Sequence, residues 1–348
     1  MSGANIAVFG ATGAVGVEMI KILEEFDLRR AGQGKEPLVK DLRLLASKGG
    51  RSARWRGGDI PVEAVGASSF EGIDIALFAV ESDVSREWAP AAAQSGVVVI
   101  DNSSAFRMDP EIPLVVPEVN EEDIARHKGI IANPNCSTII ALVPLAPLHR
   151  AATLTRVVAS TYQAVSGAGK AGLEELERQV RDYVQGKPLE ALTFQYQIAF
   201  NLIPHIDAFG EGDYTKEELK MRNESRKILH APDLRVSCTC VRVPVLRSHS
   251  EALTIETERP LSPDEARRLL ENAPGVKVID SPADKAYPMP LFASDQDLIY
   301  VGRVRRDESV EPGRNGLVLW VSGDQIRKGA ATNAVQIAEK VWEGKMIP

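Results

Sequence analysis

The sequence NIAVFGATGAVG, residues 5–16, joins a short apolar run to a turn that contains three glycines. Residues 5–9 have the apolar continuity of a buried strand, and apolar positions from residue 15 to residue 23 recur with the period of a helix. Glycines let the backbone turn tightly and approach a ligand, and the first turn of a helix offers unpaired N–H groups to a phosphate. The stretch therefore predicts the first strand, turn and helix of a parallel α/β sheet. A dinucleotide is the favoured ligand of the turn, and a tight turn without a ligand is the plainer alternative.

Short apolar runs then alternate with a helical pattern up to about residue 133. The strand candidates are residues 42–46, 73–80, 97–100 and 129–132, and the helical pattern covers residues 82–95. Strands with nearly continuous apolar residues suit a parallel sheet that is covered on both faces. We therefore predict an α/β fold that begins with a Rossmann-like, doubly wound dinucleotide-binding domain.

The rest of the chain has the mixed pattern of an α+β domain. Its predicted strands are residues 156–164, 235–246, 250–257 and 316–322, and its predicted helices are residues 137–148, 172–183 and 215–229. A last helix is predicted for residues 324–342, capped by Ser322 or Asp324 and returning through its apolar positions to the first domain. The expected domains are residues 1–133 with 324–348, and residues 134–323.

The composition restricts the classes of function. The chain has 348 residues, a net charge of −7 and three cysteines. The negative charge disfavours non-specific binding to nucleic acid or to an anionic membrane, and three cysteines make no disulfide framework. The N-terminal residues lack the basic region of a signal peptide, and no apolar run is long enough to span a membrane. These properties predict a cytoplasmic protein that acts on small molecules.

The end of the second predicted strand bears on the choice of dinucleotide. An NAD site often places an acidic residue there to hold the ribose hydroxyls. This chain has Ser47, Lys48 and Arg51 instead, a hydroxyl and two cations. The pattern favours the 2′-phosphate of NADP, and a solvated basic loop is the alternative.

One cysteine stands in NPNCST, residues 133–138, between a predicted strand end and a predicted helix start. A helix N-terminus stabilises a thiolate and can stabilise an oxyanion. A packed, unreactive cysteine is the alternative for Cys136, although its polar neighbours make a poor apolar pocket. Cys238 and Cys240 alternate within a strand pattern and lack the spacing of a zinc or redox site, so we predict that they are structural and that no metal is bound.

A nucleophile needs a base, and an anionic substrate needs cations, so we looked for further candidates among the histidines and arginines. Of the five histidines, His249 is favoured because it lies between two predicted strands. Arg107 follows the fourth predicted strand, at the sheet edge where open α/β sheets bind ligands; an ordinary exposed arginine is the alternative. Arg242 interrupts an apolar strand, so it either lines a cleft with a carboxylate partner or lies in solvent on an edge strand.

Glu217 and Lys220 are three residues apart and share one face of a predicted helix. Thr215 and Glu218 form a capping-box pattern that fixes the start of this helix. From spacing alone, the preferred interpretation of Glu217 and Lys220 is a surface pair.

Taken together, these pieces resemble the aspartate-semialdehyde dehydrogenase family over nearly the whole chain. The matching pieces are GATGAVG at 10–16, LAS at 45–47, DNSSAFRMDPEIPLVVPEVN at 101–120, NPNCST at 133–138, YQAVSGAGKAG at 162–172, EELKM at 217–221, VRVPVLRSHSE at 241–251 and IRKGAATNA at 326–334. The pieces at 101–120 and 133–138 are highly specific, whereas the glycine turn alone is not. The resemblance implies an NADP-binding domain followed by a catalytic and dimerisation domain, in a homodimer or a tetramer.

The resemblance also implies a reaction: NADPH-dependent reduction of aspartyl β-phosphate to aspartate β-semialdehyde, on the way to lysine, diaminopimelate, methionine and threonine. It makes Cys136 the nucleophile that carries an acyl thioester, His249 the general acid/base, and Gln163 the group that orients the intermediate. It assigns the substrate α-carboxylate to Arg242, the α-amino group to Glu217, and the phosphate to Arg107, Lys220 and Asn135. It assigns the cofactor to residues 12–15, which are Thr12, Gly13, Ala14 and Val15, and to Ser166 and Gly167; the glycine turn adds Gly10 and Gly16. The region 47–58 is shorter than the usual family loop, and our own candidates there for the adenosine phosphate are Ser47, Lys48 and Arg51. Gln325 stands where the family has an asparagine near the cofactor.

Two rival functions remain at this stage. Another acyl-phosphate reductase, such as the N-acetyl-glutamyl-phosphate or glyceraldehyde-phosphate type, would share the cofactor domain and the cysteine chemistry. A nucleotide-sensing regulator would bind the cofactor without turnover and would need no role for Cys136.

Overall fold

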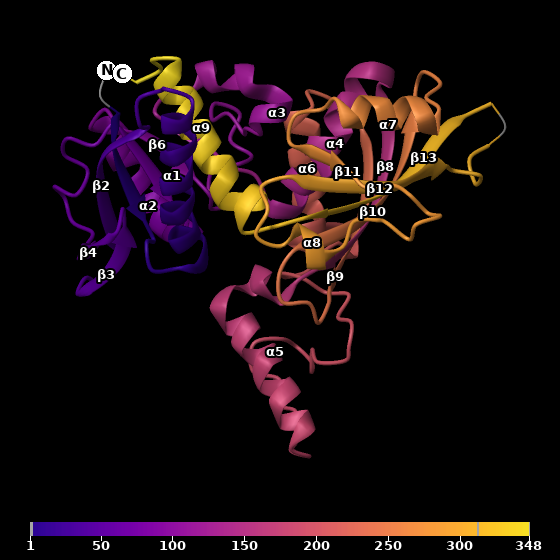
Figure 1. Cartoon of the computed structure of the whole chain (residues 1–348), viewed down its shortest axis with the longest axis horizontal. Coiled ribbons are helices and arrows are strands. Elements are labelled where there is room, and N and C mark those ends of the chain that lie inside the picture. The colour runs from indigo at the N-terminus through magenta and orange to yellow at the C-terminus, as the bar shows by residue number, and fades with distance from the viewer. Residues whose placement is uncertain (1–2, 312, 348) are drawn as a thin grey trace. The chain divides into compact units, whose positions relative to one another are not determined.

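A computed structural model describes residues 3–311 and 313–347, and its chain divides into two compact units. The first unit comprises residues 1–135 and 330–348, and the second comprises residues 136–329. Residues 324–329 thus fall in the second unit. Figure 1 follows the chain from the N-terminal unit through the second unit and back.

The sheet of the first unit has seven strands in the order β3-β4-β2-β1-β5-β6-β7. Their bounds are β1 Ala4–Phe9, β2 Val39–Ala46, β3 Arg51–Trp55, β4 Gly58–Ala64, β5 Ile75–Phe78, β6 Val98–Asp101 and β7 Ile130–Ala132. All neighbours pair in parallel except β3 and β4, which pair antiparallel. The predicted doubly wound α/β domain is confirmed, with a hairpin added at one edge.

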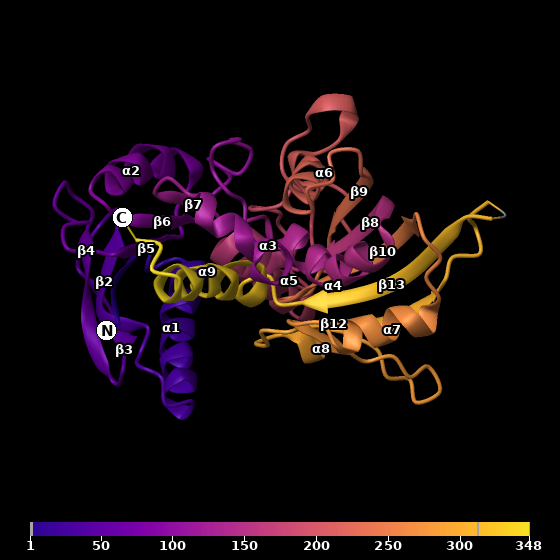
Figure 2. The ribbon, with the colours of Figure 1, turned by 90° about the horizontal axis from the view of Figure 1, so that it is seen from above.

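Helices cover both faces of this sheet, as its apolar strands require. The helix α1 (Ala14–Gly32) and the helix α9 (Thr332–Glu343) share one apolar core, while α2 (Ser82–Gln94) packs on the opposite core. Figure 2 shows α2 on one side of the strands and α1 on the other. Arg30 of α1 pairs with Glu339 and Glu343 of α9 at 2.6 and 2.7 Å. The short helices α3 (Pro117–Asn120) and η1 (Glu121–Arg126) precede β7.

The C-terminal segment differs from the single helix predicted for residues 324–342. Asp324 accepts hydrogen bonds from the backbone N–H groups of Ile326 and Arg327 at 2.9 and 3.0 Å, as the predicted cap would. Residues Arg327–Ala331 then form a π-helical turn, and only after it does α9 begin. The expected return to the first domain is confirmed, because α9 packs on α1 and β6.

The sheet of the second unit has six strands in the order β11-β12-β13-β10-β8-β9. Their bounds are β8 Leu154–Gln163, β9 Arg235–Arg242, β10 His249–Thr257, β11 Val276–Val278, β12 Ile299–Arg306 and β13 Asn315–Gly323. The sheet contains both parallel and antiparallel strand pairs, and helices occur between its strands along the chain. The predicted α+β character of this unit is therefore confirmed. Strands β11 and β12 were not predicted.

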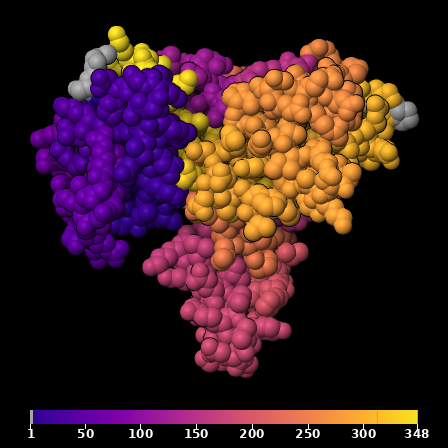
Figure 3. Space-filling view, in the orientation of Figure 1, coloured from indigo at the N-terminus to yellow at the C-terminus, as the bar shows by residue number. Residues whose placement is uncertain are grey.

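Helices of the second unit position its functional residues. The helix α4 (Cys136–Ala152) packs on β8, β10, β12 and β13, with α6 (Lys216–Ile228) and α7 (Pro263–Glu271) beside it. The α5 helix (Gly169–Val184) follows the short turn η2 (Val165–Ala168) and stands out from the rest of its unit, as Figure 3 shows. The remaining short elements are η3 (Glu211–Asp213) and α8 (Pro290–Ala293). Across residues 3–311 and 313–347, every helix is too short or too polar to cross a membrane.

Candidate active site

The glycine turn lies at the carboxyl ends of two neighbouring strands of the first unit. The N–H groups of Gly10 and Ala11 donate to the carbonyl of Leu45 in β2 at 2.9 and 3.1 Å. Helix α1 begins directly after the turn, with Gly13 at its N-cap and no side-chain cap on its first amides. Thr12, Gly13 and Ala14 are exposed. An uncapped helix start beside small residues suits an anion.

The glycines of this turn have different roles. A Cβ on Gly10, whose φ is +94°, would lie 2.2 Å from the carbonyl oxygen of Ala79, and one on Gly16 would lie 2.1 Å from that of Gly10. These two glycines are therefore required by the packing of the protein itself. A Cβ on Gly13 would meet nothing closer than 3.4 Å, so its space is left open on the solvent side. The open cradle suits the pyrophosphate of a dinucleotide.

The basic segment after β2 is a hairpin arm rather than the loop expected from the sequence. Ser47 and Lys48 are exposed just after β2, two and three residues beyond Leu45, the strand residue that binds the glycine turn. Arg51 is exposed and begins β3, which pairs with β4. The hairpin was not predicted, because both of its strands are mostly exposed and their polar residues do not form the apolar run of a buried strand.

Arg107 is buried in the first unit, not exposed in a loop. Its side chain donates to the carbonyls of Asn133 and Asn102 at 2.9 and 2.7 Å. Asn133 is itself held by Asn333 of α9 at 2.7 Å. These bonds fix a cation at the carboxyl ends of β6 and β7, and Asn135 follows two residues after Asn133.

Cys136 is the first residue of α4, as the predicted helix start requires. It is partly exposed, whereas Cys238 and Cys240 are buried on β9, as predicted. A Cβ on Gly329 would lie 3.0 Å from the Cβ of Cys136, so the backbone of Gly329 lies close against the cysteine. The position combines access with the positive end of a helix of 17 residues.

Strand register brings three of the predicted residues together in the second unit. Gln163 at the end of β8 is the direct partner of Arg242 at the end of β9. On the other side of β8, Tyr162 pairs with Ser250, which places His249 next to Gln163 along the same register. Residues in register on adjacent strands share a face of the sheet. Gln163, Arg242 and His249 therefore meet on one face, although Arg242 follows Gln163 by 79 residues and His249 follows Arg242 by 7.

The amide of Gln163 is oriented from both ends. Thr161 donates to its oxygen at 2.9 Å, and its nitrogen donates to Glu217 at 3.1 Å. Lys220 contacts Glu217 at 3.2 Å and Asp207 at 2.9 Å. The interpretation of Glu217 and Lys220 as a surface pair is wrong, because Glu217 is buried and faces Gln163. The predicted capping box of Thr215 and Glu218 is present and starts α6 at Lys216.

Arg242 lies on an edge strand and is nevertheless buried. Ile203 covers the open edge, pairing with the backbone of Arg242 in both directions at 3.0 and 2.8 Å. The guanidinium donates to the carbonyl of Ala164 at 2.7 Å and lies 5.8 Å from the centre of the Phe194 ring. Burial lowers the pKa of Arg242, and the charges of Glu217 and Cys136 oppose that shift. Among the residues of the described ranges, no carboxylate forms an ion pair with it.

His249 is fully buried at the start of β10. Its Nδ1 accepts a hydrogen bond from the N–H of Ala164 at 3.1 Å. Burial, and after it the charge of Arg242, hold the pKa of His249 well below its usual value. A Cβ on Gly167 would lie 2.7 Å from Arg242 and 3.2 Å from the imidazole, so the backbone of Gly167 covers both side chains.

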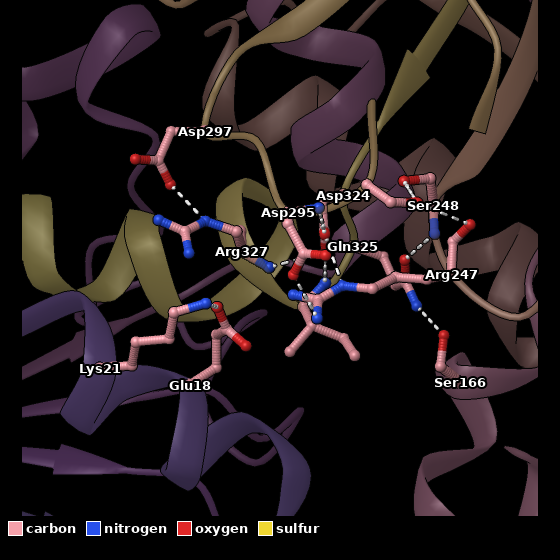
Figure 4. A network of polar contacts seen from close by, with 12 residues as sticks. Glu18, Lys21, Ser166, Arg247, Ser248, Asp295, Asp297, Asp324, Gln325 and Arg327 are labelled. Atoms are coloured by element: carbon pink, nitrogen blue, oxygen red, sulfur yellow. Dashed lines mark hydrogen bonds and ion pairs between the residues drawn. The ribbon is translucent and has the colours of Figure 1, made fainter. Parts of the chain in front are cut away.

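Gln325 lies between Ser248 and Ser166, as Figure 4 shows. Its oxygen accepts from the N–H of Ser248 at 2.8 Å, and its nitrogen donates to the hydroxyl of Ser166. Ser248 has a φ of +73°, which is unfavourable for a serine, and it precedes His249. Because both ends of the Gln325 amide are engaged, Gln325 connects the Ser166 turn to the start of β10.

Sequence reasoning missed Glu251. This residue is fully buried on β10, and neither carboxyl oxygen has a hydrogen-bond partner among the described residues. Burial, and then the charge of Glu217, raise its pKa well above the usual value. The two-residue period of a strand could have revealed it, because Glu251 follows His249 by two and shares its face.

Comparison with known proteins identifies this arrangement. Residues 5–127 match the family described as "Semialdehyde dehydrogenase, NAD binding domain", and residues 145–328 match "Semialdehyde dehydrogenase, dimerisation domain". The aspartate-semialdehyde dehydrogenase of Aquifex aeolicus is 52% identical over 99% of this chain and 100% of its own.

Solved structures agree with the sequence relatives. Aspartate semialdehyde dehydrogenase II of Vibrio cholerae, complexed with ASA, matches 99% of each chain with a TM-score of 0.92 and 46% identity. The Candida albicans enzyme with NADP matches 99% of this chain and 100% of its own, with a TM-score of 0.75 and 25% identity. Nearly the whole of this chain thus aligns with these enzymes. The aligned part includes the glycine cradle, the cysteine at a helix start and the face formed by Gln163, Arg242 and His249. The chain belongs to the aspartate-semialdehyde dehydrogenase family.

Proposed function

We propose that this protein catalyses the reversible, NADPH-dependent reductive dephosphorylation of aspartyl β-phosphate to aspartate β-semialdehyde. The observation that carries the proposal is Arg242, a buried guanidinium that donates to the carbonyl of Ala164, is attracted by the charge of Glu217, and forms no ion pair with a carboxylate among the described residues. An unpaired buried charge is costly, and a carboxylate is the ligand that a guanidinium binds with two hydrogen bonds. The α-carboxylate of an aspartyl substrate supplies that partner. The structure of a relative complexed with ASA supports the same substrate.

The neighbouring residues suit the other groups of that substrate. Glu217 supplies a buried carboxylate for the α-ammonium group, and Gln163, held by Thr161 and Glu217, supplies an oriented amide for the reacting carbonyl. We assign the phosphate to Arg107, Asn135 and Lys220, which are two cations and an amide. An acyl-phosphate of N-acetylglutamate lacks the free amine that Glu217 would bind, which argues for the aspartyl substrate.

The chemistry proceeds in two steps on Cys136. Its thiolate bonds to the acyl carbon while the bond from that carbon to the phosphate oxygen breaks, leaving a thioester. A bound NADPH would supply the hydride that the thioester carbon takes up. The carbonyl then re-forms as the carbon–sulfur bond breaks, which releases the semialdehyde and restores the thiolate. We propose His249 as the general acid/base: it gives a proton to the oxygen of the reacting carbonyl as the thiohemiacetal forms and takes it back as the carbonyl re-forms.

For the cofactor we propose NADP rather than NAD. The glycine cradle at Gly10, Thr12, Gly13, Ala14, Val15 and Gly16 suits the pyrophosphate, and Ser47, Lys48 and Arg51 suit the 2′-phosphate. A relative's structure with NADP supports this choice. Ser166 and Gly167 remain proposed cofactor contacts, and Gln325 acts on the cofactor through Ser166, whose hydroxyl it holds.

The assembly and setting follow from the family. The second unit matches a dimerisation domain, and α5 exposes Val180, Tyr183 and Val184, so we propose a homodimer or a tetramer of dimers. We propose residues 1–133 with 324–348 as the NADP-binding domain and residues 134–323 as the catalytic and dimerisation domain. The enzyme would work in the cytoplasm, in the synthesis of lysine, diaminopimelate, methionine and threonine.

The decisive experiment follows NADPH formation while aspartate semialdehyde is oxidised in the presence of phosphate. We expect turnover that requires phosphate, prefers NADP over NAD, and is absent with N-acetylglutamate semialdehyde. Turnover of N-acetylglutamate semialdehyde or glyceraldehyde phosphate in place of aspartate semialdehyde would transfer the assignment to another acyl-phosphate reductase. Cofactor binding with no turnover of any of the three aldehydes would favour a nucleotide-sensing regulator.

A further inference from the structure

Strand β10 carries a buried acid whose polar atoms are left unused. Glu251 is fully buried, and neither oxygen of its carboxyl group has a hydrogen-bond partner among residues 3–311 and 313–347. A carboxylate buried without a cation or hydrogen-bond donors is so costly that the group takes up a proton instead. Glu251 is therefore a neutral acid in the folded protein, and its carboxyl group has one proton to donate.

The charged groups around Glu251 agree with this neutral state. Burial and the like charge of Glu217 on α6 both raise the pKa of Glu251. On β9, Arg242 donates to a backbone carbonyl, and the thiol of Cys238 has a raised pKa because of its hydrogen bond to Cys240 and its burial. These neighbours give the carboxyl group no reason to ionise.

The strand register places Glu251 beside a hydroxyl group. Glu251 pairs with Thr161 of β8 on one side and with Val321 of β13 on the other, and both partners are fully buried. Side chains of directly paired residues lie on the same face of a sheet, with Cβ atoms about 4.5–5.5 Å apart. Val321 is apolar, so Thr161 is the polar neighbour across the strands. A glutamate side chain crosses this gap by rotation or through one buried water.

The hydroxyl of Thr161 also holds the amide of Gln163. It donates to the oxygen of Gln163 at 2.9 Å, and the nitrogen of Gln163 donates to Glu217 at 3.1 Å. A hydroxyl has one proton and two lone pairs, so Thr161 can only accept from a further partner while its proton is on Gln163. A neutral Glu251 supplies the matching donor. An ionised Glu251 would instead compete with Gln163 for the proton of Thr161.

The direction of these hydrogen bonds matters for the reacting carbonyl. The amide nitrogen of Gln163 carries two hydrogens, and the bond to Glu217 uses one of them. The other hydrogen can be given to the oxygen of the reacting carbonyl, where negative charge develops. Glu217 is also the proposed partner of the substrate ammonium group, so its hold on the amide is shared once substrate binds. The Thr161 end then decides whether Gln163 presents its nitrogen or its oxygen to the substrate.

We infer that Glu251 is a positioning residue: as a neutral acid it donates to Thr161 and thereby keeps the amide nitrogen of Gln163 directed at the reacting carbonyl. This inference rests on the proposed function and deepens it. Hydrogen bonds that run in one direction polarise and strengthen one another, which suits a chain of donors from Glu251 to Glu217.

Variants of Glu251 separate this role from a purely structural one. Glu251→Gln keeps a neutral group that can donate, so it should retain most of the kcat for aspartate semialdehyde. Glu251→Met has a similar volume but cannot donate, so kcat should fall by about 5–30-fold while KM and the affinity for NADP stay unchanged. Leu253→Met, a buried apolar change on the same face of β10, is the control and should leave kcat unaltered. A Glu251→Gln variant as slow as Glu251→Met, or a normal kcat in Glu251→Met, would overturn the inference.

A double-mutant cycle tests the route through Thr161. If Glu251 acts through that hydroxyl, Glu251→Met should cause no further loss of kcat in a Thr161→Val background. If the two losses multiply in full, Glu251 acts by another route and the inference fails.

A measurement without substrate separates this inference from the proposed function. The infrared difference spectrum between the wild-type protein and Glu251→Gln should contain the carbonyl stretch of a protonated carboxyl group. A carboxylate band in its place would overturn the inference, even if the protein turns over aspartate semialdehyde. Failure of the proposed function would appear instead as a wild-type protein without turnover, on which this spectrum does not depend.

Discussion

The two groups of functional residues in this chain are built in opposite ways. The glycine turn uses seven consecutive residues, presents mainly backbone amides, and needs no side chain longer than that of valine. The face around His249 uses side chains from β8, β9 and β10, which only strand register brings together. The turn is therefore sensitive to the addition of single atoms, whereas the sheet face is sensitive to charge, hydrogen bonding and burial. Each prediction below tests one side of this contrast.

The largest effect is expected for Cys136→Ala. Removing the nucleophile should lower turnover of aspartate semialdehyde by at least about 10⁴-fold, because no other thiol in the second unit is accessible. The affinity for NADP, measured by fluorescence titration, should be unchanged, because the glycine turn is intact. Cys238→Ala, a buried thiol on β9, is the control and should retain turnover. Turnover by Cys136→Ala would place the chemistry on another residue.

The second prediction contrasts two glycines of the same turn. A Cβ at residue 16 would lie 2.1 Å from a backbone oxygen, so Gly16→Ala should lower the free energy of unfolding by about 2–4 kcal/mol. At Gly13 an added Cβ would lie 3.4 Å from the nearest atom, and φ is −81°. The Gly13→Ala variant should therefore fold normally, and the added methyl group should mainly lower the affinity for NADP. Denaturant unfolding and cofactor titration separate the two effects. Equal stability losses would show that the space at Gly13 is also required by the fold.

Much of the first unit could be predicted from the sequence because its information is local. The continuous apolar runs of β1, β5 and β6 and the glycines at fixed spacing identify a doubly wound sheet without knowledge of any distant contact. The capping box that starts α6 and the cysteine that starts α4 are local signals as well. The family resemblance added the roles of residues that spacing alone left open.

What could not be predicted depends on which segment covers a residue. Arg242 is buried because Ile203 closes the edge of β9, and Arg107 is buried because Asn133 and Asn102 surround it. The contacts with Ile203 and Asn133 come from distant segments and are not visible from the pattern around either arginine. Glu251 was missed because a strand pattern does not show whether helices cover the face on which an acidic residue lies. The π-helical turn before α9 has no periodicity of its own.

The third prediction concerns the side of the contrast that depends on hydrogen bonding. Arg242→Lys keeps the charge but loses the paired donors, so the KM for aspartate semialdehyde should rise by about 10–100-fold. A smaller loss in kcat should accompany it, because the bond to the carbonyl of Ala164 is also removed. Arg235→Lys, at the exposed start of the same strand, should leave both constants unchanged. An unchanged KM in the Arg242 variant would reduce this arginine to a structural role.

The fourth prediction uses the buried acid beside the site. Because the pKa of Glu251 is raised in the folded protein, the unfolded chain loses this proton first as the pH increases. Stability should therefore fall relative to Glu251→Gln by about 1.4 kcal/mol per pH unit above the ordinary glutamate pKa, until the folded-state pKa is reached. Urea unfolding of both proteins between pH 4 and pH 8 measures the difference. Glu258→Gln, an exposed change just after β10, should show no such trend, and a flat difference for Glu251→Gln would mean that Glu251 is ionised in the fold.

The smallest effect is expected for the exposed basic segment after β2. Lys48 and Arg51 are exposed, so each would add only a screened charge near a bound 2′-phosphate. Reversing the charge of one should therefore reduce the preference for NADP over NAD by about 3–10-fold. Lys40→Glu makes the same change of charge near the other end of β2 and should leave the preference unaltered. The ratio of kcat/KM for the two cofactors, measured at low and high salt, tests the idea, because a screened contact weakens with salt. If Lys40→Glu alters this ratio as much as Lys48→Glu does, the net charge of the first unit governs the choice of cofactor. The segment after β2 would then be only a solvated basic hairpin.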